Sequence, residues 1–368
     1  MKKKLLITTD CFPPRWDGVA RFIVNSIETL KQNFDITVVA PAFDDHLHKI
    51  KGIKLLRLPL IPIRFGDIYF ALPKYWTIKR LVNDADVVFN QTIGTIGICS
   101  ILAAKSCNKK IISYIHSIEW QLAAKSVQYF QKTTLRFVKL LTKWIYNKCS
   151  LLIVPSRGVE DLLLKNDIIT RKIVIPLGVD VKKFMPRNKV LAKKTIGISP
   201  STLVIGFCGR IGREKDVPTL CSAFCLIKKE WRNARLLIVG EGLEMEECKQ
   251  KGVMITGFVD NVLPYYQAMD IFVLPSLTET SSLVTMEAMA CGLPIVVTPV
   301  GSIREYVKDG ANGLVFARGD VKGLAEQLRL LIRNKSLRHK LGTAARKTIV
   351  ETRNWNKTIT AVVRKLKV

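Results

Sequence analysis

Acidic residues are scarce in this chain of 368 residues. Only 30 Asp and Glu stand against 58 Lys and Arg, which gives a formal net charge of +28. Both halves of the chain share the excess, so it is not the mark of a basic tail. A field of this sign attracts anionic ligands such as phosphates, acidic lipid headgroups or nucleic acid. No RNP, KH, zinc-finger or helix-turn-helix pattern accompanies the charge, so we expect no specific nucleic acid partner, and a basic nucleic-acid-binding protein is kept as a remote alternative.

Long apolar runs are also missing. The longest nearly uncharged stretch, Thr92 to Ala104, is shorter than the ~20 residues that a membrane-spanning helix needs. The opening residues, MKKKLLITTD, contain a short apolar run that predicts a first β-strand and no signal peptide. We therefore expect a cytoplasmic protein whose membrane contact, if it has one, is peripheral.

Cysteine and histidine occur without the spacing of metal sites or disulfide frameworks. The 9 cysteines are scattered and the 4 histidines stand apart from them, which favours a reduced protein without zinc. Asp84 and Asp86 form a D-x-D pattern that binds metal in some enzymes. Here the pattern precedes a predicted strand, at its amino end, so we expect no metal site there.

Short apolar runs alternate with helical patterns along the chain, which is typical of parallel βαβ units. The alternation restarts after Pro176, where Pro and Gly punctuate a charged turn between Ile175 and Pro186. We predict an α/β protein with two Rossmann-like, doubly wound parallel-sheet domains, residues 1–178 and 179–354, which face a central cleft. Ligands of such sheets bind beyond the carboxyl ends of the strands, so residues directly after strands are the candidates for a site.

Two candidates follow strands of the first domain. Gly18 begins a helix after the loop FPPRWDG, and a glycine there lets backbone N–H groups approach an anion. The alternative is a simple turn before the helix. His116 follows the strand KKIISYI and, near its ordinary pKa, could exchange a proton; the alternative is a solvated loop histidine.

Two cations follow the first strand of the second domain. Arg210 and Lys215 lie in GRIGREK before a helix, an arrangement that suits a diphosphate. No Walker P-loop is present. A solvated cluster of charges is the alternative.

The segment PSLTETSSLVTMEAMACG carries two glutamates eight positions apart. Glu279 precedes a predicted helix and Glu287 lies inside it, while Ser281 and Ser282 occupy the N-cap region. The N–H groups that are free at a helix start suit phosphate or sugar oxygens. Paired carboxylates also suit a glycoside hydrolase, and one capping plus one surface glutamate is the plain structural alternative.

These segments together resemble glycosyltransferase family 4, the retaining enzymes of the GT-B fold. FPPRWDG, IPLGVD, GRIGREK, GEG, TGFVD, the two-glutamate segment and the closing Asn354-Trp355 match in order over nearly the whole chain. The resemblance implies retaining transfer of a hexose, mannose or glucose, from a nucleotide-diphosphate sugar such as GDP-mannose or UDP-glucose. It implies no cofactor and no obligatory metal, and a C-terminal helix, residues 355–368, that crosses back to the first domain.

The resemblance also implies a role for each matching residue. Arg210 and Lys215 would hold the diphosphate, Glu287 the ribose and Glu279 the sugar hydroxyls. His116 would lie near the C6 side of the sugar, Gly18 would let the first domain close on the donor, and the backbone at Val259 would contact the base. The expected donor-binding residues are Gly18, Arg210, Lys215, Val259, Glu279, Thr280, Ser281, Ser282, Leu283 and Glu287, and the expected catalytic residues are His116, Arg210, Lys215 and Glu279.

Two departures from the family pattern leave the donor sugar open. Thr280, Ser281 and Ser282 stand where many relatives have Gly-Phe-Gly, and Asp17-Gly18 stands where many have Gly-Gly. Both stretches would border the sugar.

A basic helix is predicted over Gln128 to Lys148, with a cationic face and an apolar face. Such a helix can lie on anionic lipid. The alternative is that the apolar face packs on the sheet of the first domain and the basic face meets solvent. The basic face has Lys132, Arg136, Lys139 and Lys143, and the apolar face has Phe130, Phe137, Leu141, Trp144 and Ile145.

The segment Leu58 to Trp76 is expected to be a loop that supplies Phe65, Tyr69 and Trp76 where relatives receive their acceptors. With the net charge, it favours a lipid or lipid-linked glycan acceptor at the membrane surface. The alternative is a soluble acceptor such as a sugar phosphate or a polysaccharide precursor.

Overall fold

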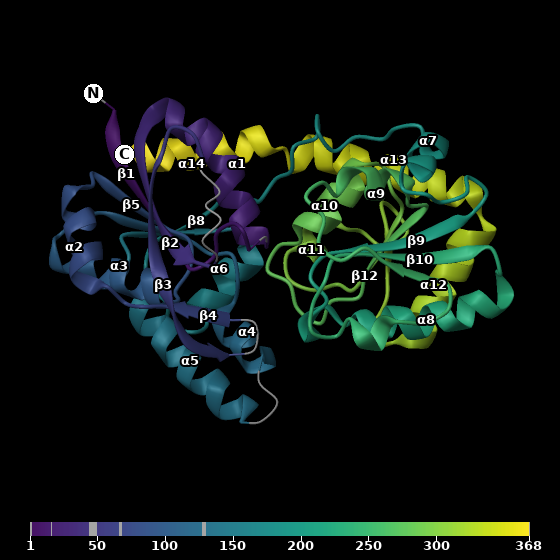
Figure 1. The fold of residues 1–368 in the computed structure, drawn as a ribbon, viewed down its shortest axis with the longest axis horizontal. Helices are drawn as coiled ribbons and strands as arrows, with labels where there is room; N and C mark the ends of the chain where they lie inside the picture. Colours follow the sequence, from purple (N-terminus) through teal and green to yellow (C-terminus); the bar gives the residue numbers. More distant parts are fainter. Residues whose placement is uncertain (1, 16, 44–49, 66–67, 127–129, 368) are drawn as a thin grey trace. The chain divides into compact units, whose positions relative to one another are not determined.

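The computed structural model describes residues 2–15, 17–43, 50–65, 68–126 and 130–367. The chain divides into two compact units, Met1–Pro176 with Ile359–Val368, and Leu177–Thr358. Each unit is an open β-sheet covered by helices on both faces (Figure 1).

The first unit contains an eight-stranded sheet in the order β4-β3-β2-β1-β5-β6-β7-β8. Every pair of neighbours is parallel except β3 and β4, which are antiparallel. All residues of β5 and β7 are buried, as expected for apolar strands with helices on both faces. The strands are β1 (Lys3–Thr8), β2 (Phe34–Ala42), β3 (Lys54–Phe65), β4 (Ile68–Ala71), β5 (Val87–Asn90), β6 (Ile111–Tyr114), β7 (Leu151–Val154) and β8 (Lys172–Val174).

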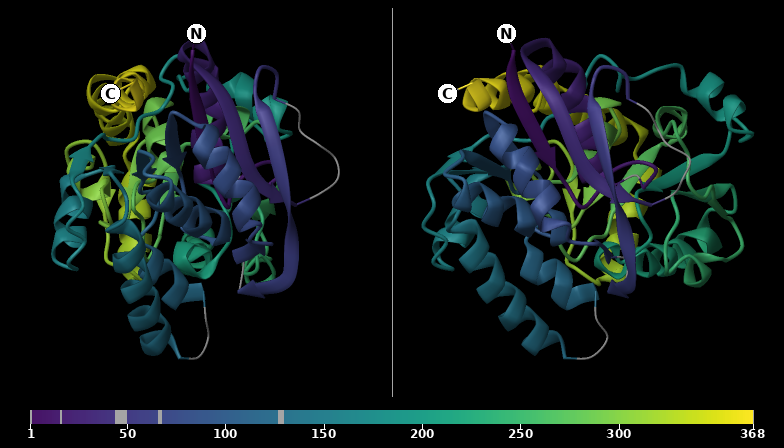
Figure 2. Two further views of the ribbon diagram at one scale, coloured as in Figure 1. Left: turned by 90° about the vertical axis from the view of Figure 1, so that its left-hand side faces the viewer. Right: turned by 60° about the vertical axis from the view of Figure 1, so that its left-hand side comes forward.

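The helices of this unit begin at a residue whose side chain caps them or soon after a strand ends. Asp17 caps the first helix, and its Oδ1 accepts hydrogen bonds from the amides of Val19 and Ala20, both at 2.9 Å. The helices are α1 (Gly18–Asn33), α2 (Tyr75–Asp84), α3 (Thr95–Ser106), α4 (Glu119–Ser126), α5 (Gln131–Tyr146) and α6 (Arg157–Leu164). Figure 2 shows α5 at the outer edge of the unit.

The second unit contains a six-stranded sheet in the order β11-β10-β9-β12-β13-β14, with all neighbours parallel. This is the Rossmann strand order. Successive strands are added toward one edge of the sheet up to β11 and toward the other edge from β12, so the order reverses between β9 and β12. Ligands of such sheets bind beyond that point. The strands are β9 (Leu203–Cys208), β10 (Ala234–Val239), β11 (Val253–Ile255), β12 (Ile271–Leu274), β13 (Ile295–Val297) and β14 (Leu314–Val315).

The helices of the second unit follow the predicted alternation. They are α7 (Lys189–Thr195), α8 (Val217–Glu230), α9 (Leu263–Ala268), α10 (Leu283–Ala290), α11 (Ile303–Tyr306), α12 (Val321–Arg333) and α13 (Lys335–Thr352), with the short 3₁₀ helices η1 (Arg213–Lys215) and η2 (Glu246–Cys248). The last helix, α14 (Trp355–Lys367), begins in this unit and continues into the first. In the part of the chain that the structure describes, no helix is both long and apolar enough to cross a membrane.

Two segments that connect the units lie side by side within the second unit. The amide of Val179 donates to the carbonyl of Arg353 at 2.8 Å, and the amide of Trp355 donates to the carbonyl of Val179 at 3.0 Å. A Cβ on Gly178 would lie 2.7 Å from the carbonyl carbon of Asn354, so a side chain there would push the segments apart. α14 begins at Trp355, and its residues from Ile359 belong to the first unit.

The expectation of a loop over Leu58 to Trp76 is wrong. The segment forms the end of β3, all of β4 and the start of α2. Pro59 lacks an amide hydrogen, which argues against a strand. Its carbonyl nevertheless accepts a hydrogen bond from Leu72 at 2.7 Å, and tertiary pairing decides the conformation. The basic helix predicted over Gln128 to Lys148 corresponds to α5, Gln131–Tyr146.

Candidate functional site

The loops after β9 and β12 lie together at the point where the strand order of the second sheet reverses. The amide of Leu277, after β12, donates to the carbonyl of Glu214, after β9, at 2.9 Å. The Gly-x-Gly after β10 packs against the same region, because a Cβ on Gly240 would lie 2.0 Å from the carbonyl oxygen of Gly209. These contacts hold the predicted cations and the first glutamate in one place.

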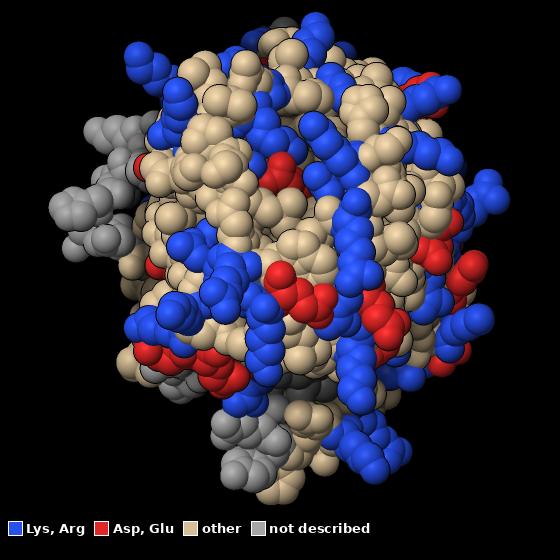
Figure 3. Space-filling view, turned by 90° about the vertical axis from the view of Figure 1, so that its right-hand side faces the viewer, with Lys and Arg blue, Asp and Glu red and all other residues tan. Residues whose placement is uncertain are grey.

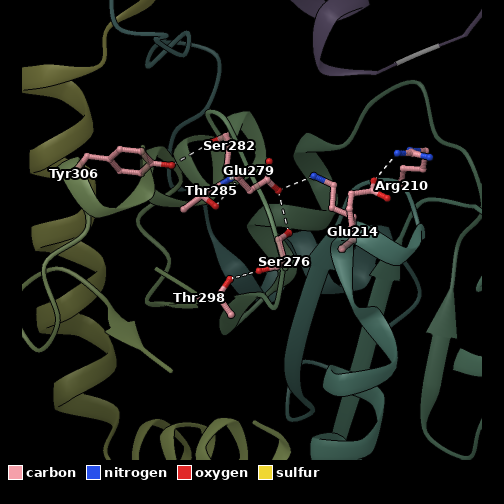
Figure 4. A network of polar contacts seen from close by, with 9 residues as sticks. Arg210, Glu214, Ser276, Glu279, Ser282, Thr285, Thr298 and Tyr306 are labelled. Atoms are coloured by element: carbon pink, nitrogen blue, oxygen red, sulfur yellow. Dashed lines mark hydrogen bonds and ion pairs between the residues drawn. The ribbon is translucent and has the colours of Figure 1, made fainter. Parts of the chain in front are cut away.

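Lys215 and Glu279 form a direct ion pair. Their Nζ and Oε1 atoms are 2.6 Å apart, and the hydroxyl of Ser276 donates to the same carboxylate oxygen at 2.9 Å (Figure 4). The side chain of Glu279 is 9% exposed and that of Lys215 is 20% exposed. A largely buried cation held by a carboxylate has a fixed position, which is what recognition of a small anionic group requires.

Arg210 lies in the same loop and forms an ion pair with Glu214 (Figure 4). Its side chain is 34% exposed. The loop therefore presents two cations, each with its own carboxylate partner.

Ser282, as predicted, is the N-cap of α10. Its Oγ accepts hydrogen bonds from the amide of Thr285 at 3.3 Å and from the Thr285 hydroxyl at 2.9 Å. Among the described residues, no hydrogen-bond partner is found for the buried Oγ of Ser281. Thr280 is 8% exposed, and Leu283 is the first residue of α10.

Glu287 is 4% exposed and the side chain of Glu279 is 9% exposed, so the alternative of a capping and a surface glutamate is excluded. The hydroxyl of Tyr266 donates to its Oε2 at 2.9 Å. Val259 is half-buried in the loop after β11. The two glutamates thus have separate partners, Lys215 and Ser276 for Glu279, and Tyr266 for Glu287.

The sequence did not reveal the residues that hold the backbone of the loop around Glu279. The hydroxyl of Thr298, after β13, donates to the carbonyl of Ser276 at 2.5 Å. The amide of Ser302 donates to the carbonyl of Thr280 at 3.1 Å, and a Cβ on Gly301 would lie 1.9 Å from the carbonyl oxygen of Glu279. Thr298 directly follows β13 and Ser276 lies two residues after β12, so both could have been chosen on that ground.

Gly18 and His116 belong to the first unit. Gly18 begins α1, but the Asp17 carboxylate already accepts from the next two amides, so those groups are not open to an external anion. His116 follows β6, where its Nε2 lies 3.0 Å from Gln91 Oε1 and its ring stacks on Tyr114 at 4.6 Å between centroids. Burial lowers the pKa of His116 to about 3. The stacked and hydrogen-bonded ring excludes the alternative of a solvated loop histidine. The expectation of a pKa near the ordinary value is wrong, because burial disfavours the charged imidazolium.

The expectation of a single apolar face on the basic helix is also wrong. Val138, Leu141 and Ile145 of α5 pack on the core of the first unit. Phe137 and Trp144, predicted on the same face, are exposed by 66% and 51%. The expected apolar face is wider than the stripe that the core can cover. Gln128 of the predicted helix lies outside the described residues.

The other three acceptor candidates have different surroundings. Trp76, at the start of α2, is 72% exposed, and Lys79 Nζ lies 5.3 Å from its ring. Tyr69, in β4, packs edge-on against Phe43 at 5.7 Å. Phe65 ends β3, and its side chain lies outside the described part of the structure.

Asp84 and Asp86, the D-x-D pair, precede β5, and both contact Lys4 of the first strand. Lys4 Nζ lies 2.6 Å from Asp84 Oδ1, and the Lys4 amide donates to Asp86 Oδ2 at 2.7 Å.

Two family models match the chain. Residues 16–183 match the model described as Glycosyltransferase Family 4, and residues 202–334 match the model described as Glycosyl transferases group 1. Each model covers the larger part of one unit.

Curated relatives cover most of the chain. An alpha-monoglucosyldiacylglycerol synthase from Acholeplasma laidlawii is 26% identical over an alignment of length 386, and the match covers 96% of this chain and 94% of the relative. A GDP-mannose-dependent alpha-mannosyltransferase from Corynebacterium glutamicum is 26% identical over an alignment of length 335, and the match covers 87% of this chain and 78% of the relative.

The crystal structure of HepE from Anabaena, in complex with UDP and glucose, has a similar fold. It superposes with a TM-score of 0.81 at 18% identity and covers 99% of each chain. The strand order of both sheets, the two family models and this likeness agree. The chain belongs to glycosyltransferase family 4 and has the GT-B fold.

Proposed function

We propose that this protein transfers a hexose, with retention, from a nucleotide-diphosphate sugar to a lipid or lipid-linked glycan acceptor at an anionic membrane surface. The observation that carries the donor half is the buried Lys215–Glu279 pair at the switch point of the second sheet. Relatives support the proposal by name, since one is a monoglucosyldiacylglycerol synthase and another depends on GDP-mannose. The similar structure of HepE holds UDP and glucose.

In the proposed reaction, Lys215 and Arg210 bind the diphosphate and neutralise the charge that develops on it as the sugar leaves. Both cations are held by carboxylates before the donor arrives, so little reorganisation is needed. Glu279 keeps one oxygen on Lys215 and Ser276 and offers the other to a sugar hydroxyl. The charge on the leaving group is met by side chains and helix amides, without a cofactor or an obligatory metal.

His116 has a different proposed role from a general base. Because its pKa is about 3, the neutral ring serves as a hydrogen-bonding group beside the sugar. The departing phosphate oxygen helps to deprotonate the acceptor, and we assign no nucleophile from the protein.

The outer side of α5 supports a membrane-bound acceptor. Phe137, Leu140 and Trp144 are exposed by 66%, 60% and 51% and lie at helical spacing, so they form one apolar stripe. Phe130, just before the helix, extends it with 82% exposure. A basic stripe lies beside it at helical spacing: Lys132 and Arg136 are exposed, Lys139 and Lys143 are half-buried, and Lys143 is paired with Asp167 at 2.9 Å. Adjacent apolar and basic stripes on one exposed helix suit insertion into an anionic interface, with about 1 kcal/mol per basic residue near the surface.

Co-sedimentation with vesicles tests the membrane half of the proposal. We expect binding to phosphatidylglycerol-rich vesicles at low salt and little binding to neutral phosphatidylcholine vesicles. The double variant Phe137→Ser/Trp144→Ser should lose most of the binding, and Lys132→Gln/Arg136→Gln should weaken it.

Matched controls distinguish binding through α5 from binding through any exposed apolar side chain or any positive charge. Leu191→Ser/Leu243→Ser removes two exposed leucines of the second unit, and Lys335→Gln/Lys340→Gln removes the same charge from α13; both should bind like the parent. Equal binding to neutral and anionic vesicles would remove the membrane proposal and favour a soluble acceptor.

A further inference from the structure

Arg353 is a buried arginine at the end of α13 whose bonding is incomplete. It is 7% exposed. Its Nη2 lies 3.3 Å from Glu305 Oε2, and within the described residues its buried Nη1 has no hydrogen-bond partner. A buried guanidinium with an unpaired nitrogen costs stability, so its contacts point to a role besides stability.

The guanidinium of Arg353 lies over the ring of Tyr306, 5.3 Å from the centroid. Tyr306, in α11, is 3% exposed, and its hydroxyl donates to the carbonyl of Ser282 at 3.4 Å (Figure 4). The same carbonyl accepts from the amide of Met286 at 3.2 Å, in the first turn of α10. Arg353 therefore reaches the N-cap of α10 through one aromatic ring.

The backbone of Arg353 is also fixed at the connection between the units. Its carbonyl accepts from the amide of Val179 at 2.8 Å, in the first connecting segment. The residue thus links that connection, through Tyr306, to the loop that carries Thr280 to Ser282.

We propose that Arg353 is a positioning residue for the donor: by holding the Tyr306 ring against the Ser282 carbonyl it fixes the start of α10 and the adjoining sugar-binding loop. The inference rests on the proposed function for its use by the donor, but the mechanical link can be tested without any donor. The residue is not a catalytic one, since its proposed effect on the donor passes through Tyr306.

Hydrogen exchange of the free protein tests the link. Arg353→Met and Tyr306→Phe should each speed amide exchange at residues 283–286, at the start of α10. Exchange at the other end of the helix, including Cys291, whose amide donates to Glu287 at 3.0 Å, should stay as in the parent. Unchanged exchange at residues 283–286 in Arg353→Met would overturn the proposal.

Kinetics with UDP-glucose and GDP-mannose as donors test whether the contact between Arg353 and Tyr306 affects donor binding. Each single variant should raise the KM for the donor by roughly three- to tenfold, the worth of one hydrogen bond, with kcat little changed. The double variant should be no worse than the worse single variant, because both remove one connection. Arg353→Lys should recover part of the loss. Additive effects would show two independent residues and contradict the proposal.

Arg346→Met is the matched control for a loss of stability. Arg346 lies on the same helix and donates to the carbonyls of Phe184, at 3.2 Å, and of Ala290, at the other end of α10. The Arg346→Met variant should have a lower Tm than the parent and an unchanged KM for the donor. If the parent protein binds neither nucleotide sugar, the proposed function fails, while the exchange result still decides the link.

Discussion

At the scale of single residues, the proposed binding of the donor depends mainly on Lys215 and Glu279. Sequence position after β9 and β12 was enough to select both of them, together with Arg210 and the Ser282 cap. It could not select Tyr306, whose contact depends on how α11 packs. It also could not show that His116 is neutral, because the lowered pKa comes from burial beside Tyr114 and Phe22.

The Lys215→Met variant should lose both stability and donor binding. The Glu279 carboxylate would be left largely buried without its cation, at a cost between roughly 1 and 3 kcal/mol, intermediate between exposed and fully buried pairs. Thermal unfolding measures the cost, and the Tm shift on adding UDP-glucose or GDP-mannose measures binding. Glu279→Gln should be less destabilised, because its amide oxygen can still accept from Ser276.

An exposed pair of the same length is the control. Lys249 and Glu246 also lie 2.6 Å apart, with side chains 57% and 73% exposed. Lys249→Met should change the unfolding free energy by less than about 1 kcal/mol and leave the donor shift intact. A full donor-induced Tm shift in Lys215→Met would contradict the assigned role.

At the scale of elements, periodicity identified α1, α5, α8 and α10 but could not divide the apolar residues of α5. Leu141 and Ile145 face the core, whereas Phe137 and Trp144 do not, although all four lie in one apolar sector of the sequence pattern. The division depends on α4, which packs beside α5. Tyr146 of α5 donates to Glu119 Oε1 of α4 at 2.5 Å.

The contact between α4 and α5 should make stability depend on pH. Burial raises the pKa of Glu119 from 4.5 to about 7, so the folded protein holds this proton more tightly than the unfolded chain. Its contribution is fully present below pH 4.5 and is lost as the pH rises through about 7. The full shift corresponds to about 3 kcal/mol. Urea unfolding at pH 5 and pH 8 should show a smaller loss for Glu119→Gln than for the parent, since glutamine does not ionise. The same loss in both proteins would contradict the raised pKa.

At the scale of the whole molecule, the alternation of strands and helices was sufficient to predict two doubly wound sheets. It did not reveal the antiparallel edge strand β4 or the short strand β8, because neither differs from a loop in its pattern. The charge contributes little to the fold. Lys and Arg are spread over the face in Figure 3, with Asp and Glu between them, so the charge forms no single patch on that face. The overall charge therefore does not decide where an anionic partner binds. Particular residues decide it, such as those on α5 and around Lys215.

The most direct test of the account is a transfer assay with radiolabelled UDP-glucose and GDP-mannose. Each donor is incubated with the protein and phosphatidylglycerol vesicles that contain diacylglycerol, and the lipid phase is separated and counted. The account predicts label in a glycolipid that retains the anomeric configuration of the donor, with at least one of the two donors. It predicts no label in that phase for Glu279→Ala or Lys215→Ala. Free labelled sugar alone, or equal transfer by Glu279→Ala and the parent, would contradict it.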